Sequence, residues 1–203
     1  MFKNSHRDTL SRFRVALPLG LTTIRVVLAP LILVWAGNGR AGLPYVFCLI
    51  LAFVTDYFDG VVARKLDVAT ATIRRYDSAA DVIFYVAALT AVWLVYPEVV
   101  VQNWLGIVLV AGLEAIRVTT DFVKFRREAS YHMWSAKGWN ITLFAALTGL
   151  MGFGISGWLF RLPIVVGILT NMEGLAASIL LPSWTHDVPT IFHAYRIRQR
   201  SKR

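Results

Sequence analysis

Residues 55–64 read Thr-Asp-Tyr-Phe-Asp-Gly-Val-Val-Ala-Arg, and residues 76–81 read Tyr-Asp-Ser-Ala-Ala-Asp. The aspartates of the first stretch are at i and i+3, and those of the second are at i and i+4, so on helices each pair shares one face. The first pair lies near the end of an apolar segment and the second at the start of the next, with a short loop between. We therefore expect four carboxylates to converge at one end of two neighbouring helices: Asp56, Asp59, Asp77 and Asp81.

The composition predicts that these helices lie in a membrane. Of the 203 residues, 57% are hydrophobic and 16% are charged, whereas a soluble domain has about 45–50% apolar and 25% charged residues. This balance excludes a soluble domain, a disordered chain, a fibrous protein and a nucleic-acid-binding protein. The only cysteine, Cys48, excludes an internal disulfide and a thiolate metal site.

Hydropathy predicts an all-α integral membrane protein in which one domain, residues 1–203, contains six transmembrane helices. We expect an N-terminal amphipathic interfacial helix over 1–16, a six-helix bundle over 17–181, and an interfacial segment with a basic tail over 182–203. Proline, glycine and charged residues predict breaks at 36–40, 96–98 and 160–163. The expected spans are Leu17–Ala36, Leu43–Ala63, Ser78–Tyr96, Trp104–Val123, Trp139–Trp158 and Leu162–Leu181.

The distribution of positive charge predicts the orientation of the chain. The net charge is +9, and lysine and arginine gather in the N-terminal segment, in the loops around 64–75 and 124–137, and in the C-terminal tail. The opposite side keeps only Arg40 and Arg161. This bias predicts a multi-pass protein of the cell (inner, cytoplasmic) membrane with both termini in the cytoplasm.

Four converging carboxylates require compensating positive charge, because they would otherwise repel and become protonated. Two divalent cations match the four negative charges, and carboxylate oxygens without nearby His or Cys favour Mg²⁺ or Mn²⁺ over zinc. A two-metal carboxylate site is suited to phosphoryl chemistry. The alternative for any single aspartate is a helix cap or an interfacial ion pair, and this is the preferred interpretation of Asp67.

The acidic stretches resemble the signature of the CDP-alcohol phosphotransferase (CDP-alcohol phosphatidyltransferase) family, D-x-x-D-G-x-x-A-R-x8-G-x3-D-x3-D. One position departs from it, since Ile73 stands where the family has its second glycine. Residues 17–25, Leu-Pro-Leu-Gly-Leu-Thr-Thr-Ile-Arg, are similar to the family's P-N-x-L-T-x-x-R entry to the first span, with Leu19 in place of Asn. The matching signature residues are Asp56, Asp59, Gly60, Ala63, Arg64, Asp77 and Asp81.

The resemblance implies an enzyme of phospholipid biosynthesis. The enzyme would transfer a phosphatidyl group from a CDP-alcohol to a hydroxyl acceptor and release CMP, and the expected donor is CDP-diacylglycerol. The family also suggests a homodimer in the bilayer without a nucleic-acid partner. By resemblance, two Mg²⁺ or Mn²⁺ ions are held by Asp56, Asp59, Asp77 and Asp81, with Asp81 also the general base, and the CDP-alcohol is contacted by Gly60, Ala63, Arg64, Thr70 and Thr22.

The identity of the acceptor remains open. Arg117 and Lys137 are candidate acceptor-binding residues, although Arg117 could equally form a structural i, i+3 ion pair with Glu114. Two other functions are alternatives. A cation-coupled transporter would also place carboxylates in the membrane, and Ile73 raises the alternative of a catalytically silent family member.

Overall fold

The computed structural model of the chain describes residues 2–39, 41–66, 68, 70–126, 131, 133–185 and 188–201. Within these ranges the regular structure is entirely helical, which confirms the predicted all-α class. The helices are α1 (Phe2–Gly37), α2 (Leu43–Lys65), α3 (Ala71–Val95), α4 (Pro97–Gln102), α5 (Trp104–Phe125), α6 (Trp134–Phe153), α7 (Trp158–Leu180) and α8 (Ile191–Arg200).

Four of these helices are long and apolar enough to cross a membrane, so the chain is a multi-pass membrane protein. The four segments are Val15–Gly37, Leu43–Ala63, Arg75–Val95 and Trp158–Leu180. Large apolar side chains such as Val27, Phe47 and Val82 are exposed on them. Soluble proteins rarely expose so much contiguous apolar surface, and in a bilayer these side chains face lipid.

The chain divides into two compact units, which are described in turn. The first comprises Met1–Pro97 together with Met151–Phe153, the last residues of α6. The second comprises Glu98–Leu150 and Gly154–Arg203.

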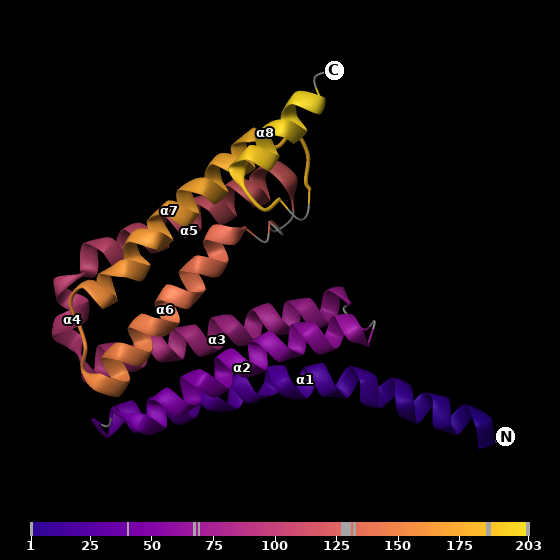
Figure 1. Cartoon of the computed structure of the whole chain (residues 1–203), viewed down its shortest axis with the longest axis horizontal. Coiled ribbons are helices and arrows are strands. Elements are labelled where there is room, and N and C mark those ends of the chain that lie inside the picture. The colour runs from indigo at the N-terminus through magenta and orange to yellow at the C-terminus, as the bar shows by residue number, and fades with distance from the viewer. Residues whose placement is uncertain are drawn as a thin grey trace. The chain divides into compact units, whose positions relative to one another are not determined.

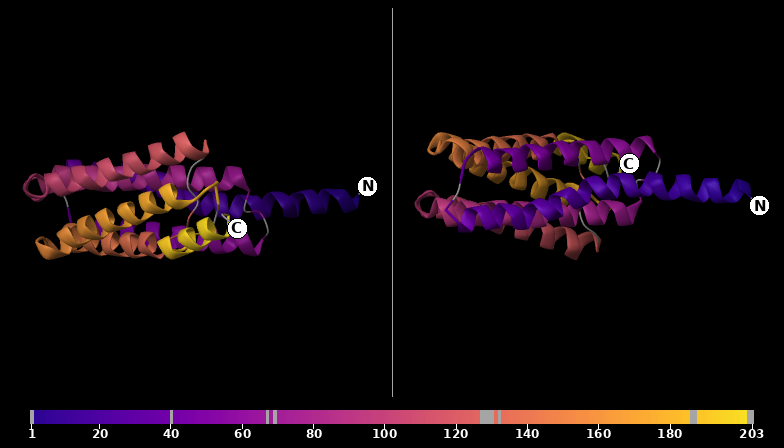
Figure 2. Two further views of the ribbon diagram at one scale, coloured as in Figure 1. Left: turned by 90° about the horizontal axis from the view of Figure 1, so that it is seen from above. Right: turned by 90° about the horizontal axis from the view of Figure 1, so that it is seen from below.

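In the first unit, α1 packs along both α2 and α3 (Figure 1). The phenol of Tyr45 on α2 donates to the carbonyl of Ala88 on α3 at 3.0 Å, which ties these two helices together. The first turns of α1 extend beyond the ends of α2 and α3 in all three views (Figures 1 and 2). The segment over 1–16, expected to be an interfacial helix, is continuous with the first span, and α1 includes Pro18. Its position in the membrane interface stays a prediction.

In the second unit, α5 and α7 run side by side in the same direction. Gly106 lies against Ile164 near their starts, and Arg117 lies against Gly174 farther along. At their ends the Lys124 ammonium donates to two carbonyls of α7. Helix α5 therefore accompanies the apolar helix α7 over its length, although its own charged residues make it less apolar. A membrane crossing by α5 and α6 remains a prediction.

The connection between α6 and α7 differs from the expectation. The predicted break at 160–163 is wrong, because α7 begins at Trp158 and includes Pro163. Gly154 ends α6 with φ +67°, and Gly157 precedes α7 with φ +75°, a backbone region that glycine adopts without strain. The chain turns at this glycine pair, and Pro163 lies in the second turn of α7.

The C-terminal segment packs on the second unit through a small apolar cluster. Helix α8 buries Ala194 and exposes Phe192 and Tyr195. The helix is amphipathic, and its position in the membrane interface stays a prediction. The buried residues of the cluster are Tyr131, Met133, Ala177, Leu181, Val188 and Ala194.

Candidate active site

The start of α3 is fixed by a side-chain cap. Thr70 has extended backbone angles, and its hydroxyl accepts the backbone N–H of Ile73 at 3.3 Å. Such a cap satisfies one of the free N–H groups of the first helical turn. Ile73 is itself buried in the first unit, so its larger side chain is accommodated and the helical spacing to Asp77 and Asp81 is kept.

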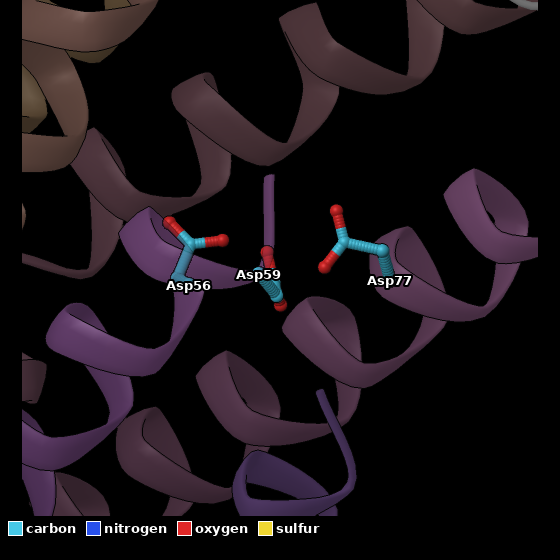
Figure 3. A group of neighbouring side chains, drawn as sticks. All are labelled: Asp56, Asp59 and Asp77. Carbon is cyan, nitrogen blue, oxygen red and sulfur yellow. The ribbon is translucent and has the colours of Figure 1, made fainter. Parts of the chain in front are cut away.

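The predicted convergence of the carboxylates is confirmed. Asp56 and Asp59 on α2 and Asp77 on α3 each offer an oxygen, and these oxygens all lie within 4.8 Å of one another. Figure 3 shows the three carboxylates turned toward a common space. Asp59 lies at the base of the group with 4% of its side chain exposed, whereas Asp56 is 46% exposed.

A buried arginine from α1 lies among the aspartates. The guanidinium of Arg25 is only 1% exposed. Its Nη1 donates to Asp56 Oδ1 at 2.8 Å and to Asp81 Oδ1, and its Nη2 donates to Asp59 Oδ2 and Asp77 Oδ1. Each terminal nitrogen therefore bridges one aspartate of α2 and one of α3.

Arg25 ends the stretch 17–25 that resembles the family's entry to the first span, but the sequence alone predicts no role for it. The available signal was a charged residue inside the apolar segment Val15–Gly37. Charged residues at such positions are rare and point to a function or to a buried partner.

Arg25 neutralises the cluster only in part. Four negative aspartates and one positive guanidinium leave a formal charge of −3. The group that could hold a metal consists of carboxylates, without His or Cys. Such hard oxygen ligands fit Mg²⁺ or Mn²⁺, so both the residual charge and the donor set suit divalent cations.

Thr22 supports the most buried carboxylate. Thr22 is 1% exposed, and its hydroxyl donates to Asp59 Oδ2 at 2.9 Å. The neighbouring Thr23 hydroxyl lies 3.0 Å from the Tyr76 phenol oxygen, which links α1 to α3 beside Asp77. Thr22, predicted as a contact of the CDP-alcohol, thus already has a partner within the protein.

The other residues predicted to contact the donor follow the aspartates along the chain. Gly60 and Ala63 lie in the turns of α2 after Asp59, and Ala63 is buried. Arg64 belongs to the last turn of α2, and its side chain lies outside the described part of the structure. Thr70 is exposed at the α3 cap. Asp67, considered above as a cap or interfacial residue, also lies outside the described residues.

The two candidate acceptor-binding residues lie in the second unit and form separate contacts there. Arg117 Nη2 donates to Glu114 Oε1, so the ion pair considered as an alternative is present. Lys137 places its ammonium 4.4 Å from the ring centroid of Trp134. Neither contact brings the two cations to one position.

The second unit also contains a buried polar group that sequence reasoning missed. Asp121 is 1% exposed and accepts a hydrogen bond from the Tyr131 phenol at 3.0 Å, and Ser178 Oγ lies 3.2 Å from the same phenol oxygen. Burial and the Asp121 carboxylate raise the pKa of Tyr131 to about 12. The group joins α5, the following loop and α7, so it serves the packing of this unit.

Comparison with known proteins places this arrangement in a family. A family model described as CDP-alcohol phosphatidyltransferase matches residues 15–173, a range that contains all four aspartates and Arg25. No curated protein matched the chain. No solved structure matched it either.

Proposed function

Because the chain belongs to the CDP-alcohol phosphatidyltransferase family, we propose that it transfers a phosphatidyl group from CDP-diacylglycerol to a hydroxyl acceptor and releases CMP. Members of this family are transferases of substituted phosphate groups in phospholipid synthesis and use divalent metals. The observation that carries the proposal is the convergence of four aspartates from α2 and α3 in the first unit.

Two Mg²⁺ or Mn²⁺ ions would be held by Asp56, Asp59 and Asp77, with Asp81 beside them. When bound, the ions neutralise charge on the phosphate oxygens. The mutual approach of three carboxylate oxygens within 4.8 Å supports this assignment.

Asp81 is the proposed general base. Its side chain is 35% exposed, so an acceptor hydroxyl can reach it, unlike the nearly enclosed Asp59. The carboxylate takes the hydroxyl proton while the acceptor oxygen bonds to the lipid-bearing phosphorus. The bond from that phosphorus to the oxygen of CMP breaks, and CMP leaves with the electron pair. A positioned base is needed because a neutral hydroxyl is a poor nucleophile at neutral pH.

The nucleotide would bind along the end of α2 and the start of α3. Gly60 and Ala63 offer little side-chain bulk there, Arg64 supplies a guanidinium for a phosphate, and Thr70 presents an exposed hydroxyl. Thr22 acts through Asp59 in this account.

The proposed arrangement in the bilayer has six spans and two cytoplasmic termini, in a homodimer in the cell membrane. The parallel course of α5 beside the apolar helix α7 supports the crossing of α5. Because α5 and α7 run in the same direction, the helix between them, α6, would have to cross the bilayer in the opposite direction. The active site then lies at the cytoplasmic end of α2, where a water-soluble acceptor arrives.

An anionic acceptor would suit the basic residues proposed to bind it, Arg117 and Lys137. Arg117 shares its charge with Glu114, and Lys137 is held beside Trp134. Substituting either residue would then raise the acceptor KM while the donor KM stays unchanged.

A catalytically silent protein and a cation-coupled transporter are less well supported. Ile73, which prompted the silent alternative, is buried next to a normal helix cap and leaves the aspartates converged. A transporter is expected to distribute its charged residues through the membrane depth, whereas these four carboxylates meet at one guanidinium.

The test is CMP release by the purified chain in lipid–detergent micelles containing CDP-diacylglycerol and Mg²⁺ or Mn²⁺. A panel of glycerol 3-phosphate, inositol phosphate, serine and phosphatidylglycerol supplies the acceptor. We expect release with one acceptor only, and its loss in Asp81→Asn. Glu98→Gln, which removes an exposed carboxylate of α4, is the matched control and should keep wild-type activity. Equal CMP release by wild type and Asp81→Asn would contradict the assignment of the base.

A further inference from the structure

Arg25 contacts the same carboxylates that would hold divalent cations. Its two terminal nitrogens donate to one oxygen of each aspartate. The oxygens of Asp56, Asp59 and Asp77 that could hold a metal belong to the same carboxylates. A guanidinium and a metal ion therefore require the same negative charges.

The side-chain environment indicates that the carboxylates determine where Arg25 lies. Its Nε is buried and has no hydrogen-bond partner in the described part of the chain. A buried donor without a partner is unfavourable. The guanidinium is nevertheless placed where its terminal nitrogens contact four carboxylates. We therefore attribute its position to attraction by the aspartates, which compensates for the missing hydrogen bond of Nε.

Charge supports the same conclusion. Without a positive group, four carboxylates from two helices would repel one another at close range, and Asp59, the most buried of them, is the least screened by water. One guanidinium reduces the formal charge to −3 and crosslinks α2 to α3 through both terminal nitrogens. Two divalent ions would add a charge of +4, and Arg25 would then compete with them for the four carboxylates.

We propose that Arg25 is an internal counter-ion that holds the four aspartates when no metal is bound and competes with the metal for them. The inference rests on the proposed function, since it takes the cluster to be a divalent-metal site. Arg25 then has two effects: it keeps α2 and α3 together without metal, and it weakens the affinity for metal. Metal occupancy would follow the ion concentration in the cell instead of being permanent.

Mn²⁺ binding to the purified chain tests this, with free Mn²⁺ measured by electron paramagnetic resonance in the absence of substrates. We expect Arg25→Gln to bind Mn²⁺ roughly tenfold tighter than wild type, because a positive charge next to the ion is removed. The metal-free variant should also unfold at a lower temperature than wild type, and Mn²⁺ should raise its unfolding temperature more.

Arg25→Lys keeps the charge but has fewer donors and no planar fork, so it cannot bridge all four carboxylates. It should bind Mn²⁺ with an affinity between those of wild type and Arg25→Gln, and it provides the test if Arg25→Gln does not fold. The matched control is Arg161→Gln, which removes an arginine that donates to Asn103 in the second unit. This control should bind Mn²⁺ as wild type does.

Mn²⁺ affinity that is unchanged or lower in both Arg25 variants would overturn the inference and leave the metal site intact. Wild-type protein that binds no Mn²⁺, or binds it equally well after Asp56→Asn and Asp77→Asn together, would overturn the proposed metal-dependent function as well. The two failures are therefore distinguishable.

Discussion

The Thr22 hydroxyl on α1 donates to Oδ2 of Asp59 on α2 at 2.9 Å, and both residues are buried. Asp59 is the least exposed of the four converging aspartates. Its orientation is thus set from a different helix, and the first span contributes to the site through a hydroxyl as well as through Arg25. Contacts that orient a metal-binding carboxylate influence both metal affinity and activity.

Removing this hydroxyl should loosen Asp59 without removing its charge. Thr22→Val keeps the shape of the side chain, and we expect Mn²⁺ affinity or kcat/KM to fall by about 10- to 100-fold. Thr22→Ser retains the hydroxyl and should stay within a few-fold of wild type. If Thr22→Val has the Mn²⁺ affinity and the kcat/KM of wild type, the hydrogen bond to Asp59 contributes to neither metal binding nor catalysis.

Asp59 and Asp81 should respond differently to the same substitution because their exposure differs, 4% against 35% of the side chain. Asp59→Asn should lose Mn²⁺ binding and activity together. Asp81→Asn should retain most Mn²⁺ binding while kcat falls by about 10²- to 10⁴-fold, the usual contribution of a general base. Measuring both quantities on each variant separates the roles, and a parallel loss of both in Asp81→Asn would assign it to metal binding instead.

Helix packing in the second unit gives a stability prediction. A Cβ on Gly167 of α7 would lie 2.7 Å from the indole Nε1 of Trp139 on α6 and 2.8 Å from Cε2, so Gly167→Ala forces a rigid ring to move. We expect a lower unfolding temperature in micelles, by circular dichroism. Gly112→Ala on α5 is the matched control, since its Cβ would meet nothing within 4 Å, and alanine favours a helix over glycine by about 1 kcal/mol. An equal effect of both substitutions would argue against the packing described.

The buried Tyr131 predicts a pH dependence. Its folded pKa of about 12 exceeds the ordinary tyrosine value, so the folded state retains a proton that the unfolded chain has lost. This contribution to stability is complete below about pH 10 and declines as the pH rises toward the folded pKa. Unfolding measured from neutral to alkaline pH should show this decline in wild type.

Tyr131→Phe is the comparison for that measurement. It should lack the Tyr131 component of the alkaline decline, and at neutral pH it should be less stable by about 1–3 kcal/mol, because Asp121 loses its buried donor. Identical pH profiles for the two proteins would contradict the raised pKa of Tyr131.

Local helical geometry explains why the acidic cluster could be predicted from sequence. Residues three and four apart share a helix face, and a short loop brings the ends of α2 and α3 together, so Asp56 and Asp77 could be expected to meet. Hydropathy predicts six spans, and four of the helices in the described part of the chain are long and apolar enough to cross a membrane.

The partners of the cluster could not be predicted in this way. Arg25 and Thr22 reach the aspartates only because α1 packs along α2 and α3, and no spacing rule connects residues so far apart in sequence. The buried hydrogen bond from Tyr131 to Asp121 could not be predicted either, because Tyr131 lies outside the helices and no helical spacing relates it to Asp121. The misplaced break at 160–163 has a local cause. Pro163 predicts a break between two spans, but a proline is tolerated near the start of a helix, and the glycine pair before α7 makes the turn.

The converging aspartates of this membrane protein are proposed to catalyse transfer of a phosphatidyl group. This is measured by supplying CDP-diacylglycerol with each acceptor of the panel in radiolabelled form and quantifying CMP and labelled phospholipid together. The account predicts equimolar CMP and labelled lipid, both abolished by chelating the divalent metal and by Asp81→Asn. CMP without labelled lipid would indicate hydrolysis instead of transfer. Absence of both products from a folded protein that binds Mn²⁺ and CDP-diacylglycerol, with every acceptor tried, would contradict the claim.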